Sequence, residues 1–292
     1  MTAVETPPPP PPPPPAATVA RRRWRPDWHV IGAVMAKDWR AILRSKPIVI
    51  PMVAVPTLLL LVIPIMIGLF ARSAEVADID RVLSQLPGGI ADQILELPQR
   101  EQMVVLILGY LLAPLILIVP IMVSAVLAAD AFAGEKERKT LEGLLHLPAN
   151  DRDLFIAKVL VAFLPSVAVT WIGFVIYSVV SNVIAWPVME RVFIPTTTWM
   201  VMIFWLAPAV SALALGLLVI VSGRTRTTQE ANQLGGAVIL PLIFIFIAQA
   251  SGLLLLPVPV ALGLGLLVWI IAGALLIYGA RRFTRDELAS MA

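Results

Sequence analysis

Six long apolar runs limit what this chain can fold into, because each holds about 20 residues or more without a charged side chain. A helix of about 20 residues crosses the roughly 30 Å of hydrocarbon in a bilayer. The composition fits such helices, with 59% hydrophobic residues, 14% charged residues and a mean hydropathy of +0.89. The sequence therefore predicts an all-α membrane protein with six transmembrane helices, at 48–70, 103–129, 159–182, 198–221, 231–255 and 258–280.

The distribution of basic residues predicts how these helices are oriented. Lys and Arg residues number 18 on one side of the predicted membrane and 4 on the other. Because cytoplasmic loops carry the excess of Lys and Arg, we expect a multi-pass membrane protein with both termini in the cytoplasm. The loops also explain the net charge of +3, so no nucleic-acid partner is expected. The absence of cysteine excludes disulfides and thiolate metal sites.

Two segments precede the first apolar run. Residues 1–26 are predicted to be a disordered, proline-rich cytoplasmic tail, in which Pro7–Pro15 could also dock in an aromatic groove. Residues 27–46 predict an interfacial amphipathic helix, and 47–285 hold the six-helix domain. Whether this helix only anchors the chain or acts as a gating lever stays open. Its apolar residues are Trp28, Ile31, Met35, Trp39 and Ile42, and its basic residues are Lys37, Arg40 and Arg44.

Residues 71–102 are the longest segment on the predicted outer side. Their apolar spacing predicts one or two short amphipathic helices, broken at 87–89 and resting on the outer leaflet, although a role in substrate capture stays open. Prolines inside the apolar runs predict kinks, because each removes a helix hydrogen bond. These prolines are residues 51, 56, 64, 114, 120, 165, 208 and 241.

The densest run of charge, at 130–158, separates the second apolar run from the third. It cannot lie in the bilayer, because each Asp, Lys or Arg at mid-membrane costs roughly 2.5 to 3.5 kcal/mol. Residues 134–147 predict a short amphipathic helix that ends before Pro148, and Asn150 with Asp153 predicts the capped start of a second helix. The first helix has a leucine face of Leu141, Leu144 and Leu145 and a polar stripe of Glu135, Lys139, Glu142 and His146.

This charged run resembles the signature that follows the second span in ABC transporter permeases of the type-2 exporter superfamily. The resemblance is carried by Asp130-Ala-Phe-Ala-Gly-Glu135, Arg138-Lys-Thr-Leu-Glu142, Leu144-Leu145, Leu147-Pro148 and Lys158. Weaker likenesses are the basic pre-membrane residues 37–46 and the short loop Thr227-Thr-Gln-Glu-Ala-Asn232.

The resemblance implies a permease that is not itself an enzyme, paired with a second permease copy or homologue and driven by a separate ATP-binding-cassette ATPase subunit. It also implies that 134–148 is a coupling helix seated on that ATPase, with Glu135, Lys139, Glu142 and His146 as contacts beside Leu141, Leu144 and Leu145. The chain has no Gly-x-x-x-x-Gly-Lys-Ser/Thr loop, so ATP and Mg²⁺ are expected in the partner, and no cofactor is expected here.

The residues also bear on three other functional classes. A membrane hydrolase is disfavoured because the only histidines, His29 and His146, lie far apart in predicted cytoplasmic segments. An ion-coupled transporter is disfavoured because the runs hold no charged residue, whereas a scaffold or assembly factor stays open. The neutral polar residues in the runs are expected to serve helix packing more than substrate binding, and they include Ser124, Ser166, Thr170, Ser178, Asn182 and Gln249.

Overall fold

The computed structural model describes residues 26–73, 94–134, 150–222 and 258–282, and this part of the chain is helical without a strand. Its α-helices and π-helical turns (η) are α1 (Trp28–Arg44), α2 (Lys46–Thr57), η1 (Leu58–Val62), α3 (Ile63–Ser73), α6 (Gln99–Val104), η2 (Val105–Leu111), α7 (Ala113–Ala128), η3 (Ala129–Gly134), α10 (Asp151–Met189), α11 (Thr197–Val201), η4 (Met202–Leu206), α12 (Ala207–Ser222) and α15 (Val258–Arg282).

Five continuous helices are long and apolar enough to cross a membrane, which confirms an all-helical membrane protein for the described residues. They are Lys46–Phe70, Gln99–Phe132, Asp151–Met189, Thr197–Val221 and Ala261–Arg282. These helices cover five of the six predicted runs. The remaining run, 231–255, lies outside the described residues, as do the tail at 1–25 and most of the predicted outer segment.

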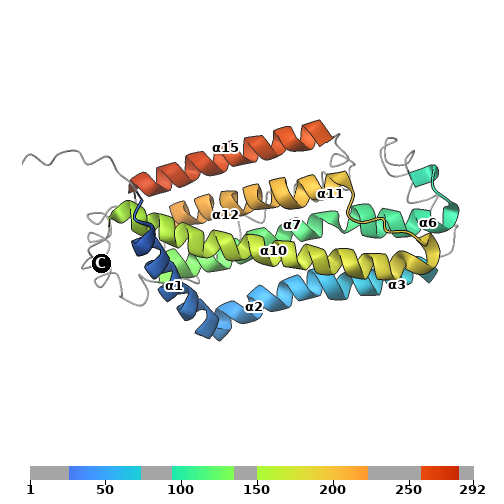
Figure 1. Ribbon diagram of the computed structural model, residues 1–292, viewed down its shortest axis with the longest axis horizontal. Coiled ribbons are helices and arrows are strands. Elements are labelled where there is room, and N and C mark those ends of the chain that lie inside the picture. The colour runs from blue at the N-terminus through green and yellow to red at the C-terminus, as the bar shows by residue number, and fades with distance from the viewer. Residues whose placement is uncertain (1–25, 74–93, 135–149, 223–257, 283–292) are drawn as a thin grey trace, which may run out of the picture.

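The long helices lie side by side along the longest axis of the molecule (Figure 1). In the bundle, α10 packs against α7, α3 and α12, while α12 also packs against α7 and α15. One end of the bundle, which we call the α1 end, holds α1, the end of η3 and the start of α10. The opposite end, the α6 end, holds α6 and the loop 190–196 between α10 and α11.

The π-helical turns η1 and η4 precede prolines in the apolar helices. Pro64 follows η1 and Pro208 follows η4, so each proline faces a carbonyl four residues earlier, of Leu60 or Phe204, that lies within the π turn. Proline has no N–H for that carbonyl and its ring crowds it, which favours a wider local turn. The sequence predicts kinks at these prolines, and the structure has π turns directly before Pro64 and Pro208.

The predicted amphipathic helix is present as α1, and its start is capped. The Asp27 carboxylate accepts hydrogen bonds from the backbone N–H of His29 at 3.0 Å and of Val30 at 3.3 Å. The helix ends at Ser45, and Pro47 stands in the first turn of α2, as expected where the chain changes direction.

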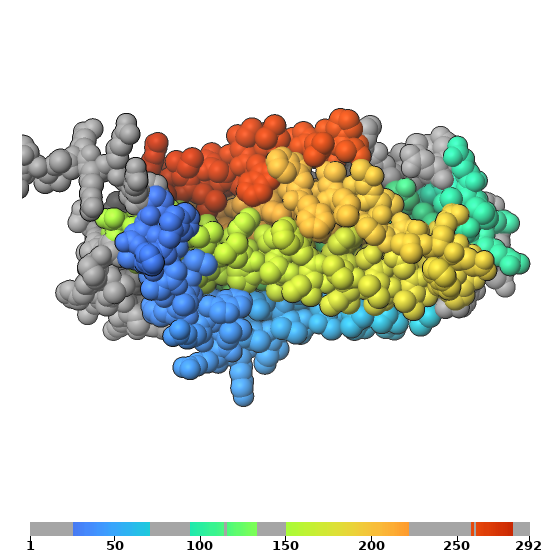
Figure 2. All heavy atoms as spheres, viewed as in Figure 1, coloured from blue at the N-terminus to red at the C-terminus, as the bar shows by residue number. Residues whose placement is uncertain are grey.

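The apolar side of α1 is covered in part by protein. Ile31, Val34 and Ile42 are buried, whereas Trp28 is 66% exposed on the surface of the chain. Ile31 and Val34 form one apolar cluster with the start of α10. Figure 2 shows α1 lying over the start of α10 at the α1 end.

Candidate functional site

The residues that the sequence predicted to contact an ATPase lie outside the described part of the chain. They are Glu135, Lys139, Leu141, Glu142, Leu144, Leu145 and His146. The structure describes the two helix ends that hold this segment, because η3 ends at Gly134 and α10 begins at Asp151. The candidate site is therefore the base of segment 135–149, and its geometry determines how a force applied to the segment would reach the bundle.

A buried lysine joins the two helices that flank this segment. The Lys158 ammonium on α10 donates a hydrogen bond of 2.8 Å to the backbone carbonyl of Ala131 in η3. Lys158 is only 1% exposed. Ala131 lies in η3, the last described helical turn before segment 135–149. The bond spans 27 residues of sequence and closes the base of the segment.

An aromatic contact lies beside this hydrogen bond. The rings of Phe132 and Phe155 have centroids 6.0 Å apart and are tilted by 54°. Both rings are buried, so they exclude water from the contact between η3 and α10. We call Ala131, Phe132, Phe155 and Lys158 together the clasp.

Helix α15 also packs beside the clasp, and Gly279 makes this close packing possible. A Cβ added at Gly279 would lie 2.6 Å from Cγ1 of Val219 and 3.7 Å from Cζ of Phe155. The first distance is too short for a real side chain, so α12 and α15 can approach this closely only with glycine at this position. Small residues commonly have this role where membrane helices pack.

The start of α10 has the position that the sequence predicted but a different hydrogen bond. Asn150 is the residue before the helix, yet its side chain does not cap a backbone N–H. Its amide instead donates to Oδ2 of Asp153 at 3.2 Å. The predicted capping hydrogen bond is thus wrong, because the short Asn side chain pairs with the nearby buried carboxylate. The carboxylates of Asp151 and Asp153 in the first turn of α10 still interact favourably with the helix dipole.

Helix α1 packs on the same part of α10. Its Ile31 and Val34 form a buried cluster with Leu154 and Ala157, within the first two turns of α10. The α1 helix, the end of η3 and the start of α10 therefore form one packed unit around the ends of segment 135–149.

Several neutral polar residues of the apolar helices bond within the bundle. Ser166 on α10 and Ser211 on α12 share a hydrogen bond, and Thr170 donates to the Ser166 carbonyl at 2.7 Å. The Ser124 hydroxyl donates to the Ile121 carbonyl at 3.0 Å. Among these contacts, the Ser166–Ser211 hydrogen bond joins two helices, as expected for packing, whereas Thr170 and Ser124 bond within their own helices. Gln249 lies outside the described residues.

The family model for the ABC-2 family transporter protein matches residues 32–262, which is most of the chain. The chain belongs to this ABC-2 transporter family. Among curated proteins, no significant match is found. The matched range begins inside α1 and ends inside α15, so it includes the clasp and both ends of the helix bundle. This ABC-2 permease is thus a membrane transport subunit.

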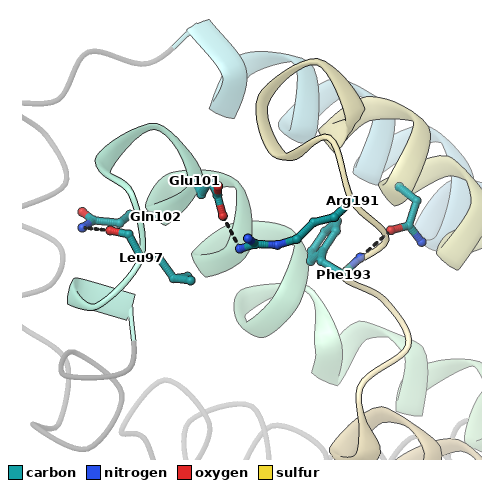
Figure 3. A network of polar contacts seen from close by, with 6 residues as sticks. Leu97, Glu101, Gln102, Arg191 and Phe193 are labelled. Atoms are coloured by element: carbon teal, nitrogen blue, oxygen red, sulfur yellow. Dashed lines mark hydrogen bonds and ion pairs between the residues drawn. The ribbon is translucent and has the colours of Figure 1, made fainter.

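The sequence interpretation of this ABC-2 permease missed a polar network at the α6 end. Glu101 on α6 pairs with Arg191 of the loop after α10, and Gln102 donates to the Leu97 carbonyl at 3.0 Å (Figure 3). Glu101 is buried, and the sequence placed it only within the predicted outer segment 71–102. One signal was present: Arg191 is the only basic residue of its predicted outer loop, so it was a candidate partner for an outer carboxylate.

No catalytic or metal-binding arrangement is found in the described ranges. Within them, no three His, Cys, Asp or Glu residues gather as metal ligands would. Two polar contacts near the ends of the bundle are therefore the features of this ABC-2 permease considered for its function. One is the clasp at the α1 end, and the other is the Glu101–Arg191 pair at the α6 end.

Proposed function

We propose that the chain is the transmembrane subunit of an ATP-driven exporter, powered by a separate ATPase that docks on segment 135–149. The observation that carries this proposal is the clasp. Lys158 and Phe155 fasten the start of α10 to the end of η3, directly beside both ends of the segment. A push on the segment would then move two long helices together and would not merely bend a loop.

The charge of the α1 end supports its assignment to the cytoplasm. Exposed basic residues gather there on α1, the start of α2 and the last turn of α15: Lys37, Arg40, Arg44, Lys46, Arg281 and Arg282. The α6 end carries Arg100 and Arg191 with Glu96, Glu101 and Glu190. By the positive-inside rule the α1 end faces the cytoplasm, where ATP is available to a partner subunit.

The remaining parts of the proposal follow from the family. A complete pathway requires a second copy of this chain or a homologous permease, in the bacterial plasma membrane. ATP and Mg²⁺ are bound by the ATPase partner, since this chain has no phosphate-binding loop. The ATPase contacts are Glu135, Lys139, Glu142 and His146, with the leucines 141, 144 and 145 on the other face of the helix.

Co-purification tests the proposal. Membranes that express the chain are extracted gently, and the retained proteins are identified and assayed for ATP hydrolysis. We expect an ATP-binding-cassette subunit in stoichiometric amount, and we expect the double variant Glu135→Lys/Glu142→Lys to lose it. The matched control is Glu96→Lys/Glu190→Lys, which reverses two exposed carboxylates at the α6 end and should retain the subunit.

Two outcomes would overturn the proposal. If gentle extraction retains no ATPase, the alternative of a scaffold or assembly factor is favoured. If the chain instead supports transport that follows an ion gradient and is unaffected by ATP depletion, it is a secondary transporter.

A further inference from the structure

Glu101 is a buried carboxylate that depends on one identified cation. Its side chain is 10% exposed, and Arg191 approaches it with the terminal guanidinium nitrogen Nη2. A buried charge whose partner is removed destabilises a protein strongly, because the carboxylate has lost its water without compensation. The pair therefore holds α6 against the loop 190–196 in the state described here.

The loop that carries Arg191 is itself fixed to α10. The Asn182 side chain accepts from the N–H of Phe193 at 2.9 Å, and its amide donates to the carbonyls of Ile194 at 2.6 Å and Ser178 at 2.7 Å. The Ser178 hydroxyl adds a bond of 3.0 Å to the Ile194 carbonyl. Asn182 is thus a positioning residue, and Arg191 moves with α10.

On the other side of the pair, α6 is short and adjoins a π-helical segment. It has six residues, Gln99–Val104, and η2 follows directly with seven. Segments of π-helix interrupt the regular hydrogen-bond ladder and are common where helices bend. Within η2, the Leu108 carbonyl accepts a hydrogen bond from the buried Tyr177 hydroxyl on α10. The second long helix is therefore held at Leu108, while α6 beyond it can tilt.

The Glu101–Arg191 pair is also open to water, unlike the clasp. The Arg191 side chain is 53% exposed, so water can take over its hydrogen bonds when the pair separates. Lys158, in contrast, is only 1% exposed.

From this geometry we propose that Glu101 and Arg191 form a latch that opens during the transport cycle, when α6 tilts about η2 away from the loop 190–196. The bundle would then open at the α6 end while the clasp stays closed at the α1 end. This inference rests on the proposed ATP-driven function, because ATP hydrolysis would supply the energy that separates Glu101 from Arg191.

The cysteine-free chain makes a direct test simple. Glu101→Cys and Arg191→Cys are introduced together in the full chain, purified with its co-purified ATPase. A bifunctional methanethiosulfonate reagent is used, because two long side chains in contact leave the backbones too far apart for a disulfide. The rate of cross-linking is measured without nucleotide and with ATP and Mg²⁺. The matched control pair is Gly109→Cys/Phe193→Cys, since a Cβ at Gly109 would lie 3.9 Å from the Phe193 ring.

We expect ATP to lower the cross-linking rate of the 101/191 pair several-fold and to leave the 109/193 pair unchanged. If both pairs slow equally, the two long helices separate as rigid bodies and the tilt about η2 is wrong. If neither pair responds while the bound ATPase hydrolyses ATP, the latch is wrong and the proposed function stands. If no ATPase is bound, the proposed function fails and the latch fails with it.

Discussion

The same two long helices are joined at both ends of the molecule, and the two joints are built differently. At the α1 end, Lys158 and the Phe132–Phe155 contact are closed off from water. At the α6 end, Glu101 is buried but its partner Arg191 is half exposed. A buried polar contact has no substitute when it breaks, whereas a half-exposed ion pair exchanges readily with water. The comparison suggests a fixed joint where energy enters and a releasable joint at the far end.

Charge reversal should give the largest contrast between the joints. Lys158→Glu places a carboxylate against the backbone carbonyl of Ala131, in a buried site, and should cost above about 5 kcal/mol. Arg191→Glu leaves the buried Glu101 carboxylate without its cation, but the new side chain can itself turn into water, so it should cost less, about 3 kcal/mol. The measurement is the amount of monodisperse protein after detergent extraction and heating. Equal losses for the two variants would show that the joints do not differ in this way.

Ring removal should give the next largest contrast. Phe155→Ala empties a site that is 5% exposed and should destabilise the protein by about 3 to 5 kcal/mol. Phe193→Ala removes a partly buried ring at the α6 end and should cost about 1 to 2 kcal/mol, because less area returns to solvent. Denaturant midpoints of the purified variants compare them. A larger loss of stability in Phe193→Ala than in Phe155→Ala would contradict the difference between the two ends.

Removing Asn182 tests how firmly the latch is positioned. Asn182→Ala deletes several hydrogen bonds to the loop 190–196 and should lower the free energy of local opening of this loop by about 2 kcal/mol. This corresponds to amide exchange that is about 30-fold faster. The N–H groups of Phe193 and Ile194 report it, since both point at the Asn182 oxygen. Ser178→Ala removes a single bond to the loop and serves as the control, with a smaller increase. Unchanged exchange in Asn182→Ala would rule out the positioning role.

High salt should have the smallest effect on stability, and it should act only at the α6 end. At about 1 M salt the screening length falls to about 3 Å, so the half-exposed Glu101–Arg191 pair should weaken by less than about 1 kcal/mol. Amide exchange over residues 99–104 should therefore rise slightly, while exchange over residues 129–133 beside buried Lys158 should not. A salt response of equal size at both segments would contradict the difference in exposure.

Much of the fold could be predicted from the sequence, because a helix in lipid must be both long and apolar. Five of the six predicted runs coincide with long helices for this reason. A helix over 27–46 was predicted from the spacing of its apolar residues, and α1 is found there. Periodicity shows that a face is apolar, and it does not show that the start of α10 rather than lipid will cover that face.

The candidate site could be predicted only in part. The sequence marked Lys158 as part of a family signature, yet its bond to the Ala131 carbonyl depends on how two helices pack after a separation of 27 residues. Glu101 looked like a solvated residue because its burial is produced by a loop 90 residues away in the chain. Pairings of this kind depend on tertiary packing, which neither local propensity nor hydropathy encodes.

The central claim is that energy from an ATPase on segment 135–149 passes through the clasp to the α6 end. It is tested most directly by amide exchange over residues 99–104 in the purified complex, with and without ATP and Mg²⁺. We expect ATP to raise this exchange in the natural chain and in Lys37→Met, which removes an exposed lysine of α1. Lys158→Met should keep the ATPase bound and lose the response. An undiminished response in Lys158→Met, or none in the natural chain with its ATPase bound, would contradict the claim.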